Sequence, residues 1–177
     1  TARGGAAWRA QLWWLFQAVF VLHTPQYMFA WRRFALVLFG AKIGKRVLIR
    51  PGVRVTYPWN LTMGDYVWIG DNVHLYSVAE ISIGSHSCIS QESYICAGTH
   101  DYRDVTFAFV STPIRIGEEC WVAARSFIGP GVEIGDAAVV GAGSVVMTSV
   151  DPETIVAGNP AKFVGKRTRD TPAVRSL

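Results

Sequence analysis

Aliphatic side chains recur at every sixth residue through most of this chain. Counted from Ile116, they form the series Ile116, Val122, Ile128, Ile134, Val140 and Val146. The following position is glycine in four of these six hexads, and the fifth position always holds a small residue or valine. A helix would instead need apolar residues at i, i+3, i+4 and i+7. A period of six contains the alternation of a short strand and leaves room for a turn, where glycine is well tolerated.

The same phase continues upstream in three further blocks, which begin at Ile43, Met63 and Ile83. Three hexads make one triangular coil, and stacked coils pair their short strands about 4.8 Å apart. The position-one side chains then fill the inside of the prism as one continuous core. We therefore predict an all-β solenoid, a parallel β-helix, over residues 43–151. An inert scaffold would show the same repeat, so the repeat predicts architecture and leaves activity open.

The repeat is interrupted at a single phase. Residues 61–62 and 81–82 separate the first three coils, and the fifteen residues 101–115 separate the third from the fourth. Every insertion is therefore expected to leave the prism from the same edge. Solenoids carry insertions on the face that binds a ligand or a partner, so a site is expected along this edge. The long insertion is apolar at residues 107–110, which favours packing against a neighbouring subunit. Folding back onto its own coil is the alternative.

His100 stands at the start of the long insertion, at an outward-facing hexad position. Imidazole is the side chain that changes charge near neutral pH, so it suits a general base. By hexad phase, Asn60, Glu80 and His100 end successive coils and are predicted to stack along one edge. Glu80 would then lie about one strand spacing from His100 and orient the ring. A backbone carbonyl is the alternative orienting group.

The N-terminal segment, residues 1–42, contains two apolar, aromatic runs at 8–22 and 26–39, with Pro25 between them. Each run is shorter than the ~20 residues that a membrane-spanning helix requires. Two short helices are expected, which either cap the open end of the prism or lie in a membrane interface. Residues 152–177 are expected to form a C-terminal tail.

The composition excludes several classes of protein. The chain has 17 Lys and Arg against 13 Asp and Glu, a net charge of +4. This excess is too mild to indicate a nucleic-acid-binding protein. Three cysteines without metal-ligand spacing favour a reducing compartment, and the first residues do not resemble a secretory signal. We therefore expect a cytoplasmic protein, with peripheral contact to the inner face of the cytoplasmic membrane through residues 8–39 as an open possibility.

Five segments together carry a family resemblance: Tyr57-Pro58-Trp59-Asn60, Ile89-Ser90-Gln91-Glu92-Ser93-Tyr94, Gly98-Thr99-His100-Asp101-Tyr102, Gly129-Pro130-Gly131-Val132 and Gly158-Asn159-Pro160-Ala161. The chain resembles the acetyltransferases of colanic acid and related exopolysaccharide biosynthesis, within the wider group of galactoside, maltose and nodulation-factor acetyltransferases. The resemblance implies a left-handed β-helix, acetyl-CoA as donor, a homotrimer, and active sites in the clefts between subunits.

The resemblance also implies roles for particular residues. His100 matches the catalytic histidine, Trp121 and Ala124 match positions near the thioester, and Ala142 matches a position along the pantetheine arm. Lys162, Lys166 and Arg167 are candidate partners for the cofactor phosphates; a solvated basic tail is the alternative. The usual Trp-Ile-Gly is Trp121-Val122-Ala123 here. Acceptor binding is assigned to these residues: Asp101, Tyr102, Asp71 and Asn72.

The predicted activity is acetyl-CoA-dependent transfer of an acetyl group to a hydroxyl of a saccharide, which in this type of pathway is often lipid-linked. The same machinery could act on the amine of an amino sugar. Two alternatives come from other classes. A γ-carbonic-anhydrase-like enzyme would need three histidines converging on zinc, and no nearby His-x4-His spacing supplies them, so no metal site is predicted. A non-catalytic assembly module is the other alternative.

Overall fold

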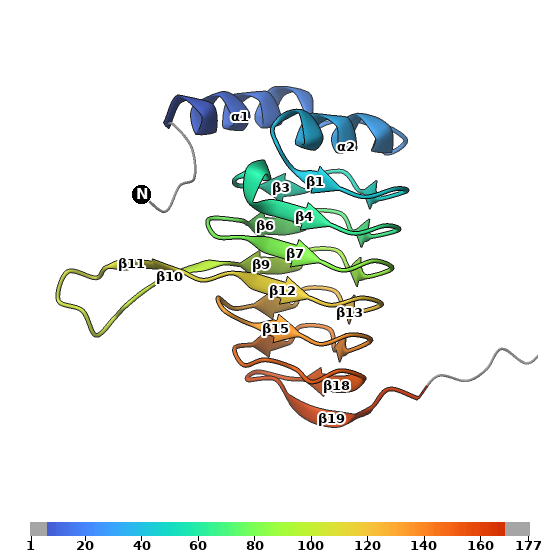
Figure 1. Ribbon diagram of the computed structural model, residues 1–177, viewed down its shortest axis with the longest axis vertical. Coiled ribbons are helices and arrows are strands. Elements are labelled where there is room, and N and C mark those ends of the chain that lie inside the picture. The colour runs from blue at the N-terminus through green and yellow to red at the C-terminus, as the bar shows by residue number, and fades with distance from the viewer. Residues whose placement is uncertain (1–6, 169–177) are drawn as a thin grey trace, which may run out of the picture.

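The computed structural model describes residues 7–168 and is a left-handed β-solenoid of about six triangular coils (Figure 1). Two helices, α1 (Ala7–Phe20) and α2 (Phe29–Leu38), lie across the N-terminal end of the stack. The predicted fold class is confirmed. Parts of the predicted N-terminal segment and tail, residues 1–6 and 169–177, lie outside the described residues.

Three sheets form the three faces of the prism, and within each coil the chain visits sheets A, B and C in that order. Sheet A contains β1 (Lys42–Ile43), β4 (Leu61–Met63), β7 (Ile81–Ile83), β12 (Ile114–Ile116) and β15 (Glu133–Ile134). Sheet B contains β2 (Leu48–Ile49), β5 (Trp68–Ile69), β8 (Cys88–Ile89), β13 (Trp121–Val122), β16 (Val139–Val140), β18 (Thr154–Ala157) and β19 (Lys162–Lys166). Sheet C contains β3 (Arg54–Val55), β6 (His74–Tyr76), β9 (Tyr94–Cys96), β14 (Phe127–Ile128) and β17 (Val145–Val146). A short 3-10 helix, η1 (Pro58–Asn60), ends the first coil.

The aliphatic position of the hexad forms the core. Of the fifteen position-one residues, only Ile43 is not fully buried, and it lies in the first strand of the stack. The parallel register aligns these positions from coil to coil, for example Ile69 with Ile89 and Ile116 with Ile134. Each aliphatic side chain therefore packs on its equivalent one coil away, and the core is a continuous column.

The two-residue separations between coils are not excursions. Leu61, Ile81 and Ile114 are buried and begin three-residue strands of sheet A. The extra pair lengthens that strand and adds one inward side chain, because alternate strand residues face the same side. The expectation that every interruption leaves the prism was wrong at these two positions.

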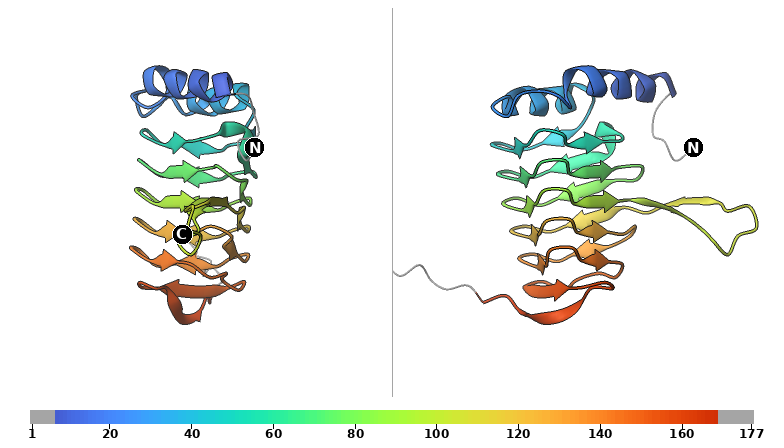
Figure 2. Two further views of the ribbon diagram at one scale, coloured as in Figure 1. Left: turned by 90° about the vertical axis from the view of Figure 1, so that its left-hand side faces the viewer. Right: turned by 180° about the vertical axis from the view of Figure 1, so that it is seen from behind.

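One segment does leave the prism, and we call residues 98–111 the arm. It is an antiparallel hairpin of β10 (Gly98–His100) and β11 (Phe109–Ser111) that projects outward from the corner between sheets C and A (Figures 1 and 2). The excursion begins and ends earlier than the predicted 101–115, since residues 114–116 already belong to sheet A. The arm does not fold back onto its own coil.

The two helices cap the open end of the solenoid with hydrogen bonds as well as apolar packing. The first coil has no coil above it, so the edge groups of its strands lack strand partners. Trp13 Nε1 donates to the oxygen of Val55 at 2.7 Å, and Gln17 Oε1 accepts from the nitrogen of the same residue at 2.7 Å. Arg33 donates to Ile43 O at 3.1 Å. Side chains of the cap therefore replace missing backbone partners.

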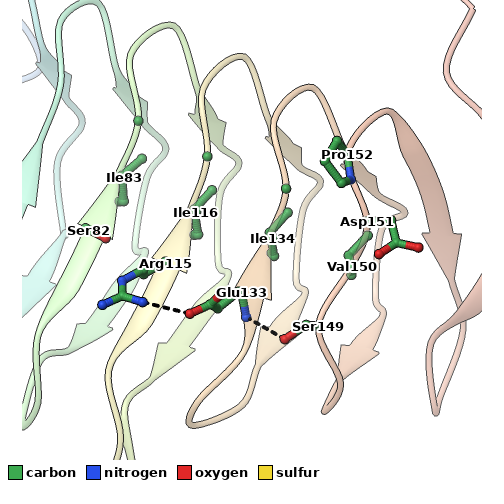
Figure 3. A pocket seen from close by; sticks show the side chains of 13 residues that line it. Ser82, Ile83, Arg115, Ile116, Glu133, Ile134, Ser149, Val150, Asp151 and Pro152 are labelled. Atoms are coloured by element: carbon green, nitrogen blue, oxygen red, sulfur yellow. Dashed lines mark hydrogen bonds and ion pairs between the residues drawn. The ribbon is translucent and has the colours of Figure 1, made fainter.

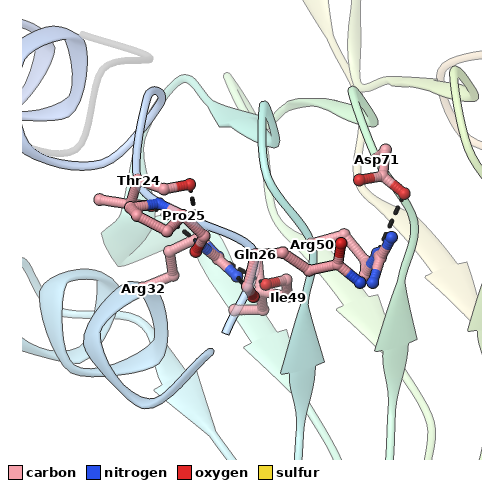
Figure 4. A network of polar contacts seen from close by, with 7 residues as sticks. All are labelled: Thr24, Pro25, Gln26, Arg32, Ile49, Arg50 and Asp71. Carbon is pink, nitrogen blue, oxygen red and sulfur yellow. Dashed lines mark hydrogen bonds and ion pairs between the residues drawn. The ribbon is translucent and has the colours of Figure 1, made fainter. Parts of the chain in front are cut away.

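Arg32 performs the same task for sheet B and also holds the connection between the two helices (Figure 4). The residue is 1% exposed, and its guanidinium donates to Ile49 O at 2.6 Å. The other donors reach Thr24 Oγ1 at 2.8 Å, Pro25 O at 2.9 Å and Gln26 O at 2.7 Å. Burial lowers the pKa of Arg32, and the nearby positive charge of Arg50 lowers it further.

Strand pairing continues past residue 151 at the other end of the stack. Ile155 and Val156 of β18 pair in parallel with β16, and β19 folds back antiparallel on β18. Arg167 then donates to the carbonyl oxygens of Glu119 at 2.7 Å and Ala137 at 3.0 Å. Much of the segment expected as a tail therefore closes the C-terminal end of sheet B.

Candidate active site

His100 ends the outgoing strand of the arm and lies opposite Phe109 in the hairpin register. The loop beyond it is held by short local bonds, which aspartate side chains commonly make in turns. Asp101 Oδ1 accepts from Arg103 N at 2.9 Å, and Asp104 Oδ1 accepts from Thr106 N at 2.8 Å. The bonds from Thr106 lower the pKa of Asp104, so the turn keeps an ionised acceptor.

The imidazole of His100 is fixed by the return strand of the same hairpin. Its Nδ1 lies 2.9 Å from the carbonyl oxygen of Phe107, and its ring stacks on that of Phe107 with centroids 4.5 Å apart. Phe109 meets the ring edge-on at 5.4 Å. A carbonyl oxygen only accepts hydrogen bonds, so the neutral ring carries its proton on Nδ1 and leaves Nε2 as the acceptor.

Glu80 is not the orienting group that the hexad phase predicted. Ile81 pairs with Ile114, and Ile114 N donates to Glu80 O at 2.9 Å. The column of Asn60 and Glu80 therefore continues to Pro113 and does not include His100. The reason is that the chain leaves the prism at Gly98, two residues before His100, so counting by hexads no longer reports position there.

Phe107 is the residue that sequence analysis missed. Its φ of 50° places it in the left-handed region and turns its carbonyl toward His100. The Asp104-Val105-Thr106 sequence signals a turn, but no feature of the sequence reports the direction of a carbonyl group. Phe107 was expected only to contribute apolar surface.

A second group of predicted residues lies along the corner between sheets B and C, here called the B–C corner. Trp121 projects from the outer face of sheet B, half exposed, and its Nε1 donates to Ser90 Oγ at 2.9 Å. Ala124 and Ala142 occupy successive turns of this corner, where Gly143 N donates to Ala124 O at 2.8 Å. Within residues 7–168, the N–H groups of Ala124 and Ala142 have no hydrogen-bond partner. Both residues have small side chains, and Ala142 is exposed while Ala124 is half-buried.

The two predicted phosphate-binding lysines are separated by the structure. Lys162 is exposed and pairs with Ala157 in the strand register, at the end of β18 that leads into the B–C corner. Lys166 pairs with Thr154 at the opposite end, and its Nζ donates to Thr154 Oγ1 at 3.0 Å. Only Lys162 therefore lies at the same corner as Ala124 and Ala142.

The four residues assigned to acceptor binding fall into two places. Asp101 and Tyr102 lie on the arm directly after His100, and Tyr102 is 77% exposed. Asp71 and Asn72 occupy the B–C corner two coils before Ala124. Asp71 Oδ2 lies 3.0 Å from Arg50 Nε, and Asn72 has the left-handed φ of 57° that asparagine tolerates in turns. Local structure accounts for both of these residues.

The two halves of the predicted site do not meet within one chain. The arm with His100 leaves from the corner between sheets C and A, whereas Trp121 lies on sheet B and Ala124 at the B–C corner (Figures 1 and 2). The exposed ring of Phe107 and the side chains of Phe109 and Val110 give the arm an apolar surface. A complete site would therefore need a second copy of the chain.

A groove of about 580 Å³ lies on the outer face of sheet A, away from both halves (Figure 3). It follows a column of glycines, Gly84, Gly117 and Gly135, and its main charged groups, Arg115 and Glu133, pair with each other at 2.8 Å. The groove contains none of the predicted site residues, and its polar groups do not converge on a point. We do not place the active site there.

Cys88 lies on the outer face of sheet B beside Trp121, in the strand register. Burial raises the pKa of its thiol, so the sulfur stays protonated at neutral pH and is a poor nucleophile. In the described part of the chain, no group of three or more His, Cys, Asp and Glu side chains is arranged to hold a metal ion.

Comparison with known proteins agrees with this fold. The family model "Bacterial transferase hexapeptide (six repeats)" matches residues 113–148. The chain is 53% identical over 165 residues to "Putative colanic acid biosynthesis acetyltransferase WcaF" of Escherichia coli (strain K12), covering 93% of this chain and 91% of the relative.

Two solved structures share the fold over most of their length. A maltose O-acetyltransferase from Clostridium difficile 630 is 25% identical, with a TM-score of 0.79 over 92% of this chain and 86% of that one. The hexapeptide-repeat acetyltransferase VCA0836 of Vibrio cholerae O1 biovar eltor, complexed with acetyl coenzyme A, is 26% identical, with a TM-score of 0.80 over 95% and 88%.

Proposed function

Because the chain belongs to the family of hexapeptide-repeat acetyltransferases, we propose that it transfers the acetyl group of acetyl-CoA to a hydroxyl of a saccharide, with His100 as general base. The observation that carries this proposal is the tautomer of His100. The bond from Nδ1 to the carbonyl of Phe107 leaves Nε2 as an exposed acceptor on the projecting arm. A hydroxyl must lose its proton as it is acylated, and Nε2 is positioned to take it.

The carbonyl of Phe107 also holds the ring in one orientation throughout the transfer. When Nε2 accepts the hydroxyl proton, the ring becomes a cation whose Nδ1–H still points at a carbonyl oxygen 2.9 Å away. A charge-assisted hydrogen bond is stronger than a neutral one. The imidazolium can then pass the same proton to the departing sulfur, so that the histidine returns to its starting form after each transfer.

The B–C corner fits acetyl-CoA, which supplies an activated acetyl thioester. Its pantetheine arm is a long, narrow chain with amide groups, and the corner offers small side chains and two unpaired backbone donors at Ala124 and Ala142. The space beside Gly143 is open, since an added Cβ would meet nothing within 4 Å. We assign Trp121 and Ala124 to the thioester end, Ala142 to the pantetheine and Lys162 to a phosphate.

We assign the acceptor to the surface around His100, where Asp101 and Tyr102 follow the base directly. A carboxylate and a phenol ring suit a saccharide, because sugars offer hydroxyl groups for hydrogen bonds and apolar ring faces for stacking. The names of the relatives favour a saccharide hydroxyl: one is assigned to colanic acid biosynthesis and another is a maltose O-acetyltransferase. Glu80 is aligned with Pro113 and not with His100, Asp71 and Lys166 have side-chain partners, and Asn72 has a left-handed turn conformation. This proposal needs none of these four residues.

The assembly that completes such a site is a homotrimer, in which the arm of each copy reaches the B–C corner of the next. A head-to-tail contact of this kind is heterologous and closes into a ring when the rotation permits. The apolar surface of the arm supports this arrangement, as do the separate places of His100 and Trp121 on one chain.

The proposed activity is tested by incubating the full chain with acetyl-CoA and a panel of neutral saccharides, amino sugars and nucleotide sugars. We expect release of free thiol that depends on a neutral saccharide, together with an acetylated product. Hydroxylamine should remove the new acetyl group, because it cleaves esters and leaves amides intact. An acetyl group that resists hydroxylamine would instead mean transfer to an amine, and no transfer with any acceptor would contradict the proposal.

Lys162→Gln is expected to lower kcat/KM for acetyl-CoA by about tenfold, the loss of one charge-assisted phosphate contact. The same variant should act normally on acetyl-pantetheine, which lacks the nucleotide phosphates. Lys166→Gln is the matched control and should leave both values near wild type. Equal losses on the two donors would show that Lys162 does not contact a phosphate.

A further inference from the structure

The outer surface of the helical cap is almost entirely apolar. Only three of the fourteen residues of α1 are polar: Arg9, Gln11 and Gln17. Gln17 accepts a hydrogen bond from Val55 N, and Arg9 donates to Phe39 O, so two of the three are directed toward the protein. A helix that is apolar on all sides is normally buried on all sides. Here only one side of α1 is covered.

The exposed apolar residues lie on the outer side of both helices, and together we call them the distal patch. On α1, Trp8, Leu12, Leu15 and Val19 are spaced by four, three and four residues, which places them on one side of the helix, opposite the buried side. Trp8 is 67% and Leu15 is 66% exposed. Their counterparts on α2 complete the distal patch: Phe34, Val37 and Leu38. Both helices lie flat across the end of the prism, so the patch faces away from it (Figures 1 and 2).

The charged side chains of the cap and the first coil are all cationic. None of the thirteen acidic residues of the chain precedes Asp65, whereas nine of the seventeen Lys and Arg residues lie in 1–64. The guanidinium groups of Arg32 and Arg33 donate hydrogen bonds to carbonyl oxygens. Four exposed cations lie on the first coil, next to the cap, and we call them the basic collar: Lys42, Lys45, Arg46 and Arg54.

We propose that the distal patch and the basic collar dock the protein on an anionic lipid bilayer. Tryptophan and leucine side chains enter the boundary between headgroups and acyl chains, and lysine and arginine beside them bind anionic headgroups. A second copy meeting the patch head-on would bring two basic collars together, and like charges repel. A bilayer satisfies both the apolar surface and the charge around it.

The docking is peripheral. No helix within residues 7–168 has the length and hydropathy needed to cross a bilayer. Two short helices lying in the plane of the interface bury one face each, which is the geometry of a monotopic contact. The prism then stands upright on the membrane, with its coils stacked away from the lipid.

The test is flotation of the full chain with vesicles of phosphatidylcholine alone or mixed with phosphatidylglycerol. We expect flotation with the mixed vesicles, weaker flotation with phosphatidylcholine, and a decrease at high salt, because screening weakens the attraction to headgroups. Equal recovery with both vesicle types at every salt concentration would overturn the role of the collar.

Two double variants distinguish vesicle binding by the distal patch from nonspecific hydrophobic adsorption. Leu12→Gln with Leu15→Gln is expected to reduce vesicle partitioning at least about tenfold. Phe163→Gln with Val164→Gln removes apolar groups that are at least as exposed on average, at the opposite end of the solenoid, and should leave partitioning unchanged. Thermal midpoints and acetyl transfer to a soluble saccharide check that the folds are intact. Unchanged flotation of the Leu12 and Leu15 variant, or a smaller oligomer as its only defect, would overturn the proposal, the latter by assigning the patch to a second copy.

Discussion

Replacing His100 with alanine is expected to lower kcat for saccharide acetylation by about a thousandfold, within the usual contribution of a general base. The variant keeps the B–C corner intact, so the KM for acetyl-CoA should stay near its wild-type value. Stability should change little, because the ring is exposed on a projecting hairpin. Steady-state thiol release measures both constants. His86→Ala is the control, since His86 is also an exposed, ring-stacked histidine but lies on the solenoid. Loss of less than tenfold at His100 would remove it as the base.

Mixing two inactive variants tests where the halves of the site come from. Ala142 is exposed, so a tryptophan at this position should not disturb the core. Its ring would fill the B–C corner where the pantetheine is assigned, so Ala142→Trp should be inactive. Randomly reassembled mixtures of His100→Ala and Ala142→Trp would then contain intact sites wherever an unmodified arm meets an unmodified corner. With equal amounts, about a quarter of the sites recover if the site lies between copies. No recovery after verified exchange of subunits would show that each site belongs to one chain.

Replacing Arg32 with leucine is expected to destabilise the cap by about 4 kcal/mol, because three carbonyl groups lose the side-chain donor that they share, and each unsatisfied group costs about 1–3 kcal/mol. The three shortest bonds to carbonyl groups reach Ile49 O, Pro25 O and Gln26 O, and both oxygens of Thr24 also accept from the guanidinium (Figure 4). Arg32→Lys should recover only part of the loss, since a single ammonium cannot span the same set of acceptors. Arg33→Leu is the matched control. Arg33 has two acceptors but is only half-buried, so water can replace the lost donor and the change should cost about 1 kcal/mol.

Hydrogen exchange shows where the loss falls. A solenoid is stabilised by contacts between neighbouring coils, so damage at one end need not reach the other. In the Arg32→Leu variant, amides of α2 and of the connection at residues 21–28 should exchange faster, while those of β13 to β16 should keep their protection. Uniform loss of protection along the stack would contradict local capping by Arg32.

The solenoid could be predicted because one residue type at one position decides the fold. Ile69, Ile89 and Val122 each face inward for the same reason, and the hexad spacing repeats that reason in every coil. Counting failed where the chain left the stack. Counting in steps of six residues placed His100 at the end of the third coil, but the backbone had already turned outward at Gly98. The register of Glu80 with Pro113 is a property of strand pairing, which the sequence does not specify at the end of an insertion.

The candidate site was partly predictable for a related reason. His100 and Ala124 could be named from local motifs, whereas the group that orients His100 is the main chain of Phe107, and main-chain carbonyls are common to every residue. The separation of Lys162 from Lys166 depends on how β19 folds back along β18. Contacts made by side chains across a strand pair need the pairing to be known first.

The regular rise of the coils sets the distance between the cap and the arm. Along sheet C the strands follow the order β3, β6, β9, and the arm departs just after β9. Two rises of about 4.8 Å, together with a helical layer about 10 Å thick, hold His100 about 20 Å from a bilayer in contact with the cap. The height of His100 above the bilayer would then decide which sugar of a membrane-anchored chain is acetylated. A hydroxyl a few rings from the lipid would be favoured over identical hydroxyls elsewhere in the chain. Deleting or adding one coil between the cap and the arm would change which ring is modified.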